Sequence, residues 1–534
     1  MTISALDWGI IAVYLTAMVA FGLWLSRKTS SGEDYFLGGR SIPPLIAAMS
    51  IMATQTSTIS LIGAPAFVAL KEGGGLRWLQ YEIALPLAML LIMVIFVPML
   101  WRSGVVTIYE FLEERFGVGT RLILSAVFLV SRSIATGVTV FASAVVLQVV
   151  TGAPLWVLIS IIGGVCLVYS TMGGLVADVY TDAVQLVVLW GCVVLSIVLV
   201  LMELPDLSAI FNMAPDRTVA LDFATHGLGD GGTFGFWPLL FGGVFLYMSY
   251  YGTDQTQVQR VLAAPSVEDA RKSLFFNGLM RFPLVLSYVL FGVALAALVA
   301  HDPSLREAVP DKHLDYLVPI FIVRYLPTGV IGIVIAGMIA ATMSSLDSTF
   351  NSLSASTMRD YVERFGLVSA KDQRKYLLTA RGVTFFWGIL CCSFAFLVGG
   401  ISDTVIESIN KIGSVFYGPV LAVFLLAFLT RWVTALGAVA GLVAGVGLNI
   451  YLWIAQDSIS WLWWNVFGLV VAVAIAVLLS LPSLGKARAE AEDTARKTDP
   501  TTTSDWVRYG VLLAVTVLII AVSWGLSWFL STGG

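Results

Sequence analysis

Charged residues are scarce in this sequence of 534 residues: they make up 12% of it, about half the share usual in soluble domains, which argues against a soluble fold. The four cysteines all lie in apolar stretches, at spacings that match no metal motif, so we expect them to pack rather than to bind metal. No phosphate-binding loop is present, which argues against ATP as the energy source. No nucleophile with a neighbouring base and no haem, flavin or nucleic-acid motif appears either, so neither an enzyme nor a nucleic-acid-binding protein is expected.

Long apolar runs take the place of the missing charge. A helix needs roughly 20 apolar residues to cross the hydrocarbon core of a bilayer, and fourteen runs meet this requirement. The runs are continuous rather than alternating, which favours helices over barrel strands. We therefore predict an all-α membrane protein with about fourteen transmembrane helices. The runs lie near 6–26, 42–70, 78–101, 121–150, 155–172, 182–202, 235–258, 274–300, 316–352, 378–400, 412–430, 433–455, 459–481 and 508–530.

Lysine and arginine are unevenly distributed between the two sets of loops. If the N-terminus lies outside, 21 of the 30 basic residues fall in the inner loops and only six in the outer ones. The positive-inside rule then places both termini outside, which agrees with an even number of helices in a plasma (inner) membrane. The first run follows Asp7, has no basic stretch before it and no cleavage signal, so we expect it to be retained.

Two runs contain unusual polar segments. The second carries six polar side chains among residues 53–60, and Gly63-Ala64-Pro65 follows them. This pattern predicts a discontinuous helix that lines a polar cavity, as in transporters. The alternative is a tightly packed helix held to its neighbours by Ser and Thr hydrogen bonds. The seventh run has a comparable segment at 247–257.

Matching segments five helices apart indicate an inverted repeat, although the two halves share no detectable sequence identity. The halves would be residues 42–202 and 235–430, joined by an external loop at 203–234. The first helix and its inner loop (1–41) would precede them, and three C-terminal helices (431–534) would follow.

The ninth run carries a face of small and hydroxyl-bearing residues, because helical spacing places Ala341, Ser344, Ser345, Ser348 and Ser352 side by side. Hydroxyl and carbonyl oxygens suit a hard cation such as sodium. The alternative is a packing face that lets helices approach closely.

Four ionisable residues lie at or near membrane depth, where such groups are costly and usually functional. Asp347 lies in the ninth run, whereas Asp182 and Glu82 open the sixth and third runs and fit an interfacial position as well. Arg132 is some eleven residues inside the fourth run, roughly 16 Å along a helix. It needs either a ligand anion or a carboxylate partner, for which Asp182 and Glu82 are the candidates.

Several motifs together resemble the sodium/solute symporter family, which includes sodium-glucose, proline, sialic-acid, monocarboxylate, multivitamin and iodide transporters. The resemblance covers nearly the whole chain up to the eleventh helix. It implies the LeuT-type fold of five plus five inverted helices, with one helix before and three after. The motifs are Asp34 to Arg40, Tyr81-Glu82, Thr107 to Gly117, Gly173 to Asp182 with Gln185, Gln259-Arg260 and Ser344-Ser345.

The resemblance also implies ion sites, with sodium as the coupling ion. A common sodium site would consist of backbone carbonyls of the second run and small residues of the ninth. A second sodium would bind near Asp182; Asp347 stands where the family often has serine or threonine, so a proton in place of this ion stays open. The common site would be Ala53, Thr56, Ala341, Ser344 and Ser345, and the second would be Asp182, Ser345, Asp347 and Ser348.

Substrate residues in the family lie between the two discontinuous helices. Tyr250 matches the aromatic inner gate of sugar-transporting members, and Arg132 stands roughly where sialic-acid members place an arginine that meets the substrate carboxylate. The stretch from Ser57 to Pro65 is closer to the monocarboxylate, vitamin and iodide branch. The implied substrate residues are Gln55, Thr58, Glu82, Arg132, Tyr247, Tyr250 and Asn410.

The resulting hypothesis is a sodium-coupled symporter that imports a small solute by alternating access. An organic anion such as a carboxylate or sialic acid is favoured over a sugar or a neutral amino acid. A membrane sensor that does not transport is the alternative from another class. The expected partners are the solute and the lipid bilayer, with the protein a monomer or weak oligomer.

Overall fold

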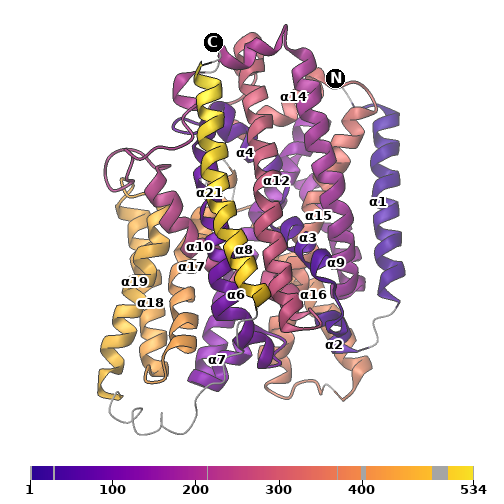
Figure 1. Ribbon diagram of the computed structural model, residues 1–534. Helices are drawn as coiled ribbons and strands as arrows, with labels where there is room; N and C mark the ends of the chain where they lie inside the picture. Colours follow the sequence, from indigo (N-terminus) through magenta and orange to yellow (C-terminus); the bar gives the residue numbers. More distant parts are fainter. Residues whose placement is uncertain are drawn as a thin grey trace.

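The protein is a bundle of long helices in the computed structural model, which describes residues 3–27, 31–212, 214–369, 371–397, 405–483 and 503–532 (Figure 1). Among these residues no β-strand occurs, and extended pairing is limited to one isolated bridge between Leu228 and Ile459. The prediction of an all-α protein is confirmed.

Eleven helices within the described ranges are long and apolar enough to cross a membrane, or up to twelve if one strongly bent pair forms a further span. That pair joins residues 32–40, which include α2 (Gly32–Leu37), to α3 (Pro44–Gln55) at 116°. The eleven are α1 (Ala5–Ser26), α6 (Ala84–Arg102) with the residues before it from Gly75, α8 (Val118–Thr151), the part of α9 (Leu155–Glu203) from Ser170, α12 (Val267–His301), α15 (Val330–Ser356) continued to Glu363, α16 (Gln373–Phe394), α17 (Val405–Leu429), α18 (Ala435–Ala455), α19 (Trp461–Ser480) continued to Ser483, and α21 (Thr503–Thr532).

The remaining three predicted runs are helical but short or interrupted, which is why eleven is smaller than fourteen. The second run is α3 followed by α4 (Thr58–Leu70). The fifth run is the first part of α9. The seventh is η5 (Pro238–Gly242), α10 (Gly243–Thr253) and α11 (Gln255–Leu262). Shorter helices also occur: η1 (Gly38–Arg40), η2 (Gly75–Trp78), α5 (Leu79–Glu82), α7 (Ile108–Phe116), α13 (Pro303–Glu307), η6 (Leu314–Tyr316), α14 (Leu317–Tyr325), η7 (Thr357–Glu363) and η8 (Leu481–Ser483).

Both polar segments interrupt their helices, as expected. Between α3 and α4 the backbone leaves the helical region at Thr56 (ψ 84°) and Ser57 (ψ 178°), and the Ser57 hydroxyl accepts a hydrogen bond from the amide of Ile59. Between α10 and α11 the break is Asp254 (ψ 120°), whose carboxylate accepts from the amide of Thr256 at 2.8 Å. Each new helix therefore begins with its own N-cap, which satisfies an amide that the break has freed.

Gly174 interrupts α9 without ending it. Its φ of 69° lies in the left-handed region, and a Cβ atom there would come within 3.0 Å of the Tyr35 ring. Glycine is the residue that tolerates both conditions. Residues 173–181, which separate the fifth and sixth predicted runs, are helical apart from Gly174. Asp178 and Asp182 therefore both lie in the second part of α9.

The predicted external loop at 203–234 is ordered where the structure describes it, with η3 (Leu207–Asn212) and η4 (Pro215–Arg217). Arg217 donates to the carbonyl oxygens of Val68, Leu70 and Lys71 at 3.1–3.2 Å and so covers the end of α4. Burial acts to raise the pKa of Asp222, but hydrogen bonds from Thr225 and Arg77 outweigh it and hold that pKa below its usual value.

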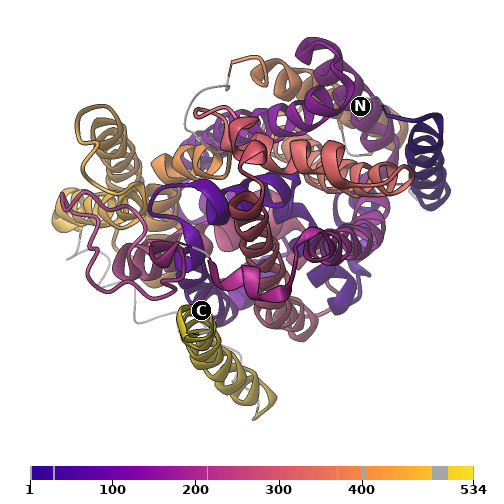
Figure 2. The same cartoon turned by 90° about the horizontal axis from the view of Figure 1, so that it is seen from above.

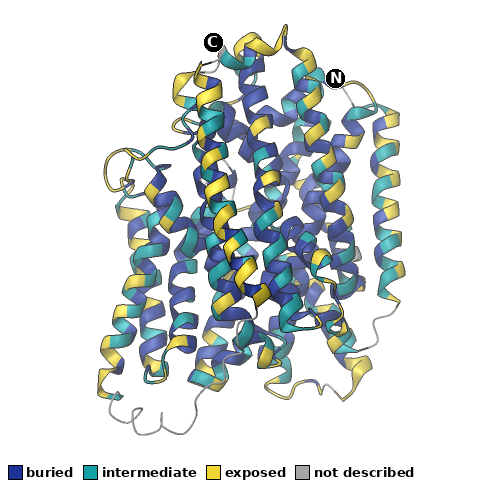
Figure 3. Ribbon diagram, in the orientation of Figure 1, coloured by how far each residue is buried: buried dark blue, intermediate teal, exposed yellow. Residues whose placement is uncertain are grey.

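The outer helices surround a densely buried centre. Seen from above, α18 and α19 lie on one side of the bundle and α1 on the opposite side, with α21 at the edge (Figure 2). Exposed residues follow the outward faces of α1, α19 and α21, whereas the interior is buried throughout (Figure 3). Helix α1 begins and α21 ends at the same end of the bundle (Figure 1).

Candidate functional site: an oxygen cluster and a polar cavity

The end of α3 meets the hydroxyl face of α15. The Ser344 hydroxyl lies 3.2 Å from the carbonyl oxygen of Ala53 and 3.1 Å from that of Ala341. The Ser345 hydroxyl lies 3.0 Å from the carbonyl oxygen of Thr54 and 3.2 Å from that of Ala341. Three carbonyl and two hydroxyl oxygens thus lie close together at the C-terminal end of α3, just before the break between α3 and α4.

This donor set fits a sodium ion, which prefers hard, uncharged or weakly charged oxygen ligands. Four of the five predicted sodium residues, Ala53, Ala341, Ser344 and Ser345, lie within it. Thr56 was predicted to contribute its backbone carbonyl, which the side-chain contact of this residue, a hydrogen bond accepted from Arg281 at 3.1 Å, does not test. The carbonyl that reaches Ser345 belongs instead to Thr54, at the last turn of α3, where carbonyl groups lose their helical partners.

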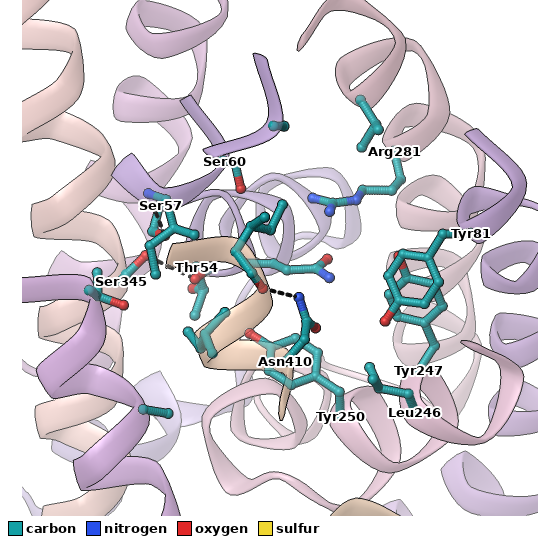
Figure 4. A pocket seen from close by; sticks show the side chains of 18 of the residues that line it. Thr54, Ser57, Ser60, Tyr81, Leu246, Tyr247, Tyr250, Arg281, Ser345 and Asn410 are labelled. Atoms are coloured by element: carbon teal, nitrogen blue, oxygen red, sulfur yellow. Dashed lines mark hydrogen bonds between the residues drawn. The ribbon is translucent and has the colours of Figure 1, made fainter. Parts of the chain in front are cut away.

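Beside this cluster lies a polar cavity of about 100 Å³, bounded by the break between α3 and α4 and by α8, α10, α12 and α17. Figure 4 shows Ser57 and Ser345 on one side and the Tyr81 and Tyr247 rings on the other, with Arg281 extending between them. Six of the seven predicted substrate residues line this cavity: Gln55, Glu82, Arg132, Tyr247, Tyr250 and Asn410.

Thr58 is the exception. It is the first residue of α4, and its hydroxyl turns away from the cavity to bond the carbonyl of Met338 at 2.8 Å and the hydroxyl of Thr342 at 2.6 Å. The prediction of Thr58 as a substrate residue is therefore not supported by its position. It joins α4 to α15 instead.

Two arginines approach the cavity from opposite helices. Arg132 of α8 is 9% exposed and pairs with Asp254 at 3.4 Å, with its guanidinium 5.5 Å from the centre of the Tyr250 ring. The expectation that its acidic partner would be Asp182 or Glu82 was wrong, because those residues lie beside other cations. Arg281 of α12 is 6% exposed and lies 3.7 Å from Glu82.

Aromatic and amide groups complete the wall. The Tyr247 hydroxyl donates to Glu82 at 3.0 Å, and its ring stacks on Tyr81 with centroids 4.6 Å apart. Gln55, which lines the cavity, accepts a hydrogen bond from the hydroxyl of Tyr251, which does not. Asn410 donates to the carbonyl of Ile406 at 2.7 Å, the bond drawn in Figure 4. Flat rings with polar edges suit a small solute that has both apolar and hydrogen-bonding parts.

Two of the four residues predicted for a second sodium, Asp182 and Ser348, contact the buried Arg260. Asp182, which is fully buried, accepts hydrogen bonds from Ser50 at 2.5 Å and from Arg260 at 3.2 Å, and Ser348 also lies 3.4 Å away. Arg260 donates to Ser348 as well. Asp347 accepts from the amide of Ser348 at 2.6 Å, and its other carboxylate oxygen has no hydrogen-bond partner. Asp182 therefore already faces a cation.

Arg281, Asp254 and Arg260 are not among the site residues predicted from the sequence, although Gln259-Arg260 is one of the family motifs. For Arg281 the signal was available, because it stands inside an apolar run just as Arg132 does. Asp254 lay within the unusual segment of the seventh run, but nothing in the sequence paired it with Arg132. Their partners come from helices distant in sequence, so the pairing required the fold.

A bundle of membrane-crossing helices with two interrupted helices around a polar cavity defines a secondary transporter. Comparison with known proteins makes this class specific. Residues 35–445 match the model of the sodium:solute symporter family, and the chain belongs to this family. It is a membrane transporter of a sodium-coupled family and not an enzyme, as the sequence predicted.

Three relatives are similar to this chain to about the same degree. The human sodium/iodide cotransporter is 29% identical over 86% of this chain and 70% of its own length. Sodium-coupled monocarboxylate transporter 1 of Xenopus laevis is 28% identical over 84% and 72%. A putative sodium-dependent multivitamin transporter of Drosophila melanogaster is 28% identical over 86% and 76%.

The solved structure of a Na⁺-coupled sialic acid symporter superimposes with a TM-score of 0.78 at 23% identity, covering 89% of this chain and 98% of that one. At this identity the likeness concerns the fold. It supports the helical arrangement described above without specifying a solute.

Proposed function

We propose that this protein imports a small organic anion, such as a carboxylate or sialic acid, together with sodium by alternating access. The observation that carries the proposal is that two buried arginines, Arg132 and Arg281, line one polar cavity between interrupted helices. Guanidinium groups bind carboxylates through paired, charge-assisted hydrogen bonds. Relatives named for iodide and monocarboxylates support an anion.

Charge balance links the anion to the ion. The cavity wall holds two arginines and one acid, Glu82, and Asp254 pairs with Arg132 without lining the cavity, so the formal charges of these four groups cancel. An entering anion adds one negative charge to a buried site, which is costly unless a cation accompanies it. A sodium ion beside Ser345, which lines the same cavity, would supply that charge.

Asp254 competes with the substrate in this scheme. In the absence of solute it neutralises Arg132, and a substrate carboxylate would take its place at the guanidinium. Asp254 also forms the break between α10 and α11. If the substrate carboxylate replaced Asp254 at Arg132, the backbone at that break would therefore be free to change its conformation. Substrate binding and helix rearrangement would then be coupled.

A neutral solute, a sugar or a neutral amino acid, is the second candidate. It is favoured by the pairing itself, since both arginines already have carboxylate partners and the wall offers hydroxyl and amide groups from Tyr81, Tyr247 and Asn410. A neutral solute would leave the Arg132–Asp254 pair intact. The two candidates therefore differ in whether Asp254 opposes binding.

For the ions, we propose one sodium at Ala53, Ala341, Ser344 and Ser345, with carbonyl oxygens at the end of α3. Thr56 keeps a role only through its carbonyl. A second sodium at Asp182, Ser345, Asp347 and Ser348 stays a proposal. Arg260 weakens it, because a guanidinium occupies one side of Asp182.

The architecture proposed from sequence agrees with this function. We propose fourteen spans in the membrane, with residues 42–202 and 235–430 as inverted repeats of five helices. The interruptions at 56–57 and 254, in the second and seventh predicted runs, support the repeat. Both termini would lie outside a plasma (inner) membrane, and the protein would act as a monomer or weak oligomer.

Uptake in proteoliposomes tests the function. The purified protein would be given radiolabelled lactate, iodide, sialic acid, glucose and proline, each with an inward sodium gradient or an equal potassium gradient. We expect sodium-dependent uptake of at least one anion and none in protein-free vesicles. Uptake confined to glucose or proline would replace the anion by the neutral solute, and uptake equal in both gradients would remove sodium coupling.

A further inference from the structure

A second cavity, of about 120 Å³, lies outside the polar site. It is enclosed by α1, α8, α9 and α15, with Thr58 of α4 at its inner end, and shares no lining residue with the polar cavity. In Figure 1, α1 lies at the side of the bundle next to α9 and α15.

The wall of this second cavity is almost entirely apolar. Its three hydroxyl groups, those of Thr58, Ser143 and Thr342, lie within hydrogen-bond distance of one another, with 2.6 Å from Thr342 to each of the others. Each also reaches a backbone carbonyl within 2.8–3.1 Å. The hydroxyl protons are thus taken up within the protein, and the rest of the wall is mostly apolar, a lining that holds water poorly and accepts hydrocarbon.

The cavity opens towards the surroundings of the bundle rather than towards its centre. Trp8 of α1 and Ile161 of α9 line it and are 49% and 54% exposed. Both lie close to the first turns of their helices, within about 5 and 9 Å of the start at 1.5 Å per residue. Exposed side chains at this depth of a membrane span meet acyl chains just below the headgroups, the level that tryptophan prefers.

We propose that this cavity binds an acyl chain of a bilayer phospholipid. The chain would enter between α1 and α9 and pack against Ile162 and Ile339, with its end at Thr58. Thr58 follows the break between α3 and α4, and Met338, also in the wall, lies one turn before Ala341. A bound chain would therefore support the contact between α4 and α15 from behind. The proposal does not depend on which solute is transported.

Photolabelling of the wild-type protein tests it directly. The protein would be placed in nanodiscs of palmitoyl-oleoyl phosphatidylcholine containing a phosphatidylcholine with a diazirine in one acyl chain, and labelled peptides would be mapped by mass spectrometry. We expect labels in the walls from α1, α8, α9 and α15 several-fold above those on α18, where Leu436 and Ile454 are 73% and 79% exposed. Equal labelling of the cavity wall and α18 would overturn the proposal.

A matched pair of variants in α9 adds a second readout. Ile162→Trp fills the cavity, whereas Val168→Trp adds the same side chain at an exposed position (61%) outside it. Labelling of α1 and α15 should fall several-fold in Ile162→Trp and stay unchanged in Val168→Trp. Equal labelling of the two would contradict the site. Labelling of the wild type by diazirine-palmitic acid but not by the phospholipid would also overturn the proposal, by assigning the cavity to a free fatty acid.

Discussion

At the scale of single residues, Arg132 is the strongest test of the substrate class. Lysine keeps the charge of Arg132 but loses the planar, two-pronged geometry. If a substrate anion binds here, Arg132→Lys should weaken its binding by roughly 1.5–3 kcal/mol, about 10- to 150-fold. Sodium binding without substrate should barely change. Equilibrium binding of the labelled anion identified by uptake measures the first, and sodium binding in its absence the second.

Asp254 provides the matched control. Asp254→Asn keeps a capping side chain for α11 but removes the competing charge, so the anion should bind several-fold more tightly. A neutral substrate predicts no gain, since it would not need the guanidinium. Unchanged affinity in both Arg132→Lys and Asp254→Asn would make the pair structural and would end the anion hypothesis at this site.

The sodium site can be tested through its two hydroxyl groups. Replacing Ser344 and Ser345 together by alanine removes two oxygen ligands, each worth about 1 kcal/mol when treated like a hydrogen-bond partner. The sodium concentration for half-maximal uptake should then rise roughly tenfold or more. Ser354→Ala is the control, because Ser354 lies on the same helix but bonds the carbonyl of Ala380 at 2.9 Å. An unchanged sodium dependence in the double variant would remove this site.

The sequence predicted which charged residues are buried better than it predicted which residues they pair with. Arg132 and Glu82 are buried in the cavity wall as their depth suggested, because a charge inside an apolar run must lie in the protein interior. Arg132 pairs with Asp254 rather than with Asp182 or Glu82, since partner choice depends on helices that the chain brings together only on folding. Thr58 shows the same limit. It is the first residue of α4, and the direction of its side chain depends on how the helix starts after the break, which the sequence does not reveal.

At the scale of helices, the two interruptions were predictable and their consequences were not. Clusters of polar residues at membrane depth indicate an interruption, because an unbroken lipid-facing helix would not carry them. The sequence did not reveal that Arg260 of α11 would reach Asp182 of α9, Ser50 of α3 and Ser348 of α15. Four helices thus meet at one buried ion pair.

This ion pair gives a prediction for Asp182→Asn. Arg260 is fully buried, and removing one partner of a buried pair typically costs 3–5 kcal/mol because the other charge is left uncompensated. We expect the melting temperature in detergent to fall markedly, and the number of sodium ions transported per solute in the protein that remains folded distinguishes the ion pair from a second sodium at Asp182.

Neutralising both partners separates this role from ion binding. Asp182→Asn combined with Arg260→Gln removes the uncompensated charge, so stability should recover in large part. If Asp182 instead holds a second sodium, the double variant would still transport fewer ions per solute. A changed ratio in Asp182→Asn without loss of stability would therefore favour the second sodium over the ion pair.

At the scale of the whole molecule, the oxygen cluster and the cavity share a boundary. Ser345 donates to the carbonyl of Thr54 and also lines the cavity together with Thr54 and Gln55. A sodium ion that fixes the end of α3 against α15 would thereby fix one wall of the substrate cavity. Coupling between the two ligands then follows from one shared helix end, without a long pathway.

Reciprocal linkage makes this coupling measurable. If saturating sodium tightens substrate binding by some factor, saturating substrate must tighten sodium binding by the same factor, typically about 5- to 150-fold for coupled sites. Both affinities would be measured at equilibrium on the purified protein, with the solute found in the uptake experiment. Because the coupling runs through Ser345, Ser345→Ala should reduce both factors together, whereas Ser354→Ala should leave both unchanged. Substrate affinity independent of sodium in the wild type would contradict the shared wall, even if both ligands bind, and would require the two sites to be linked only during transport.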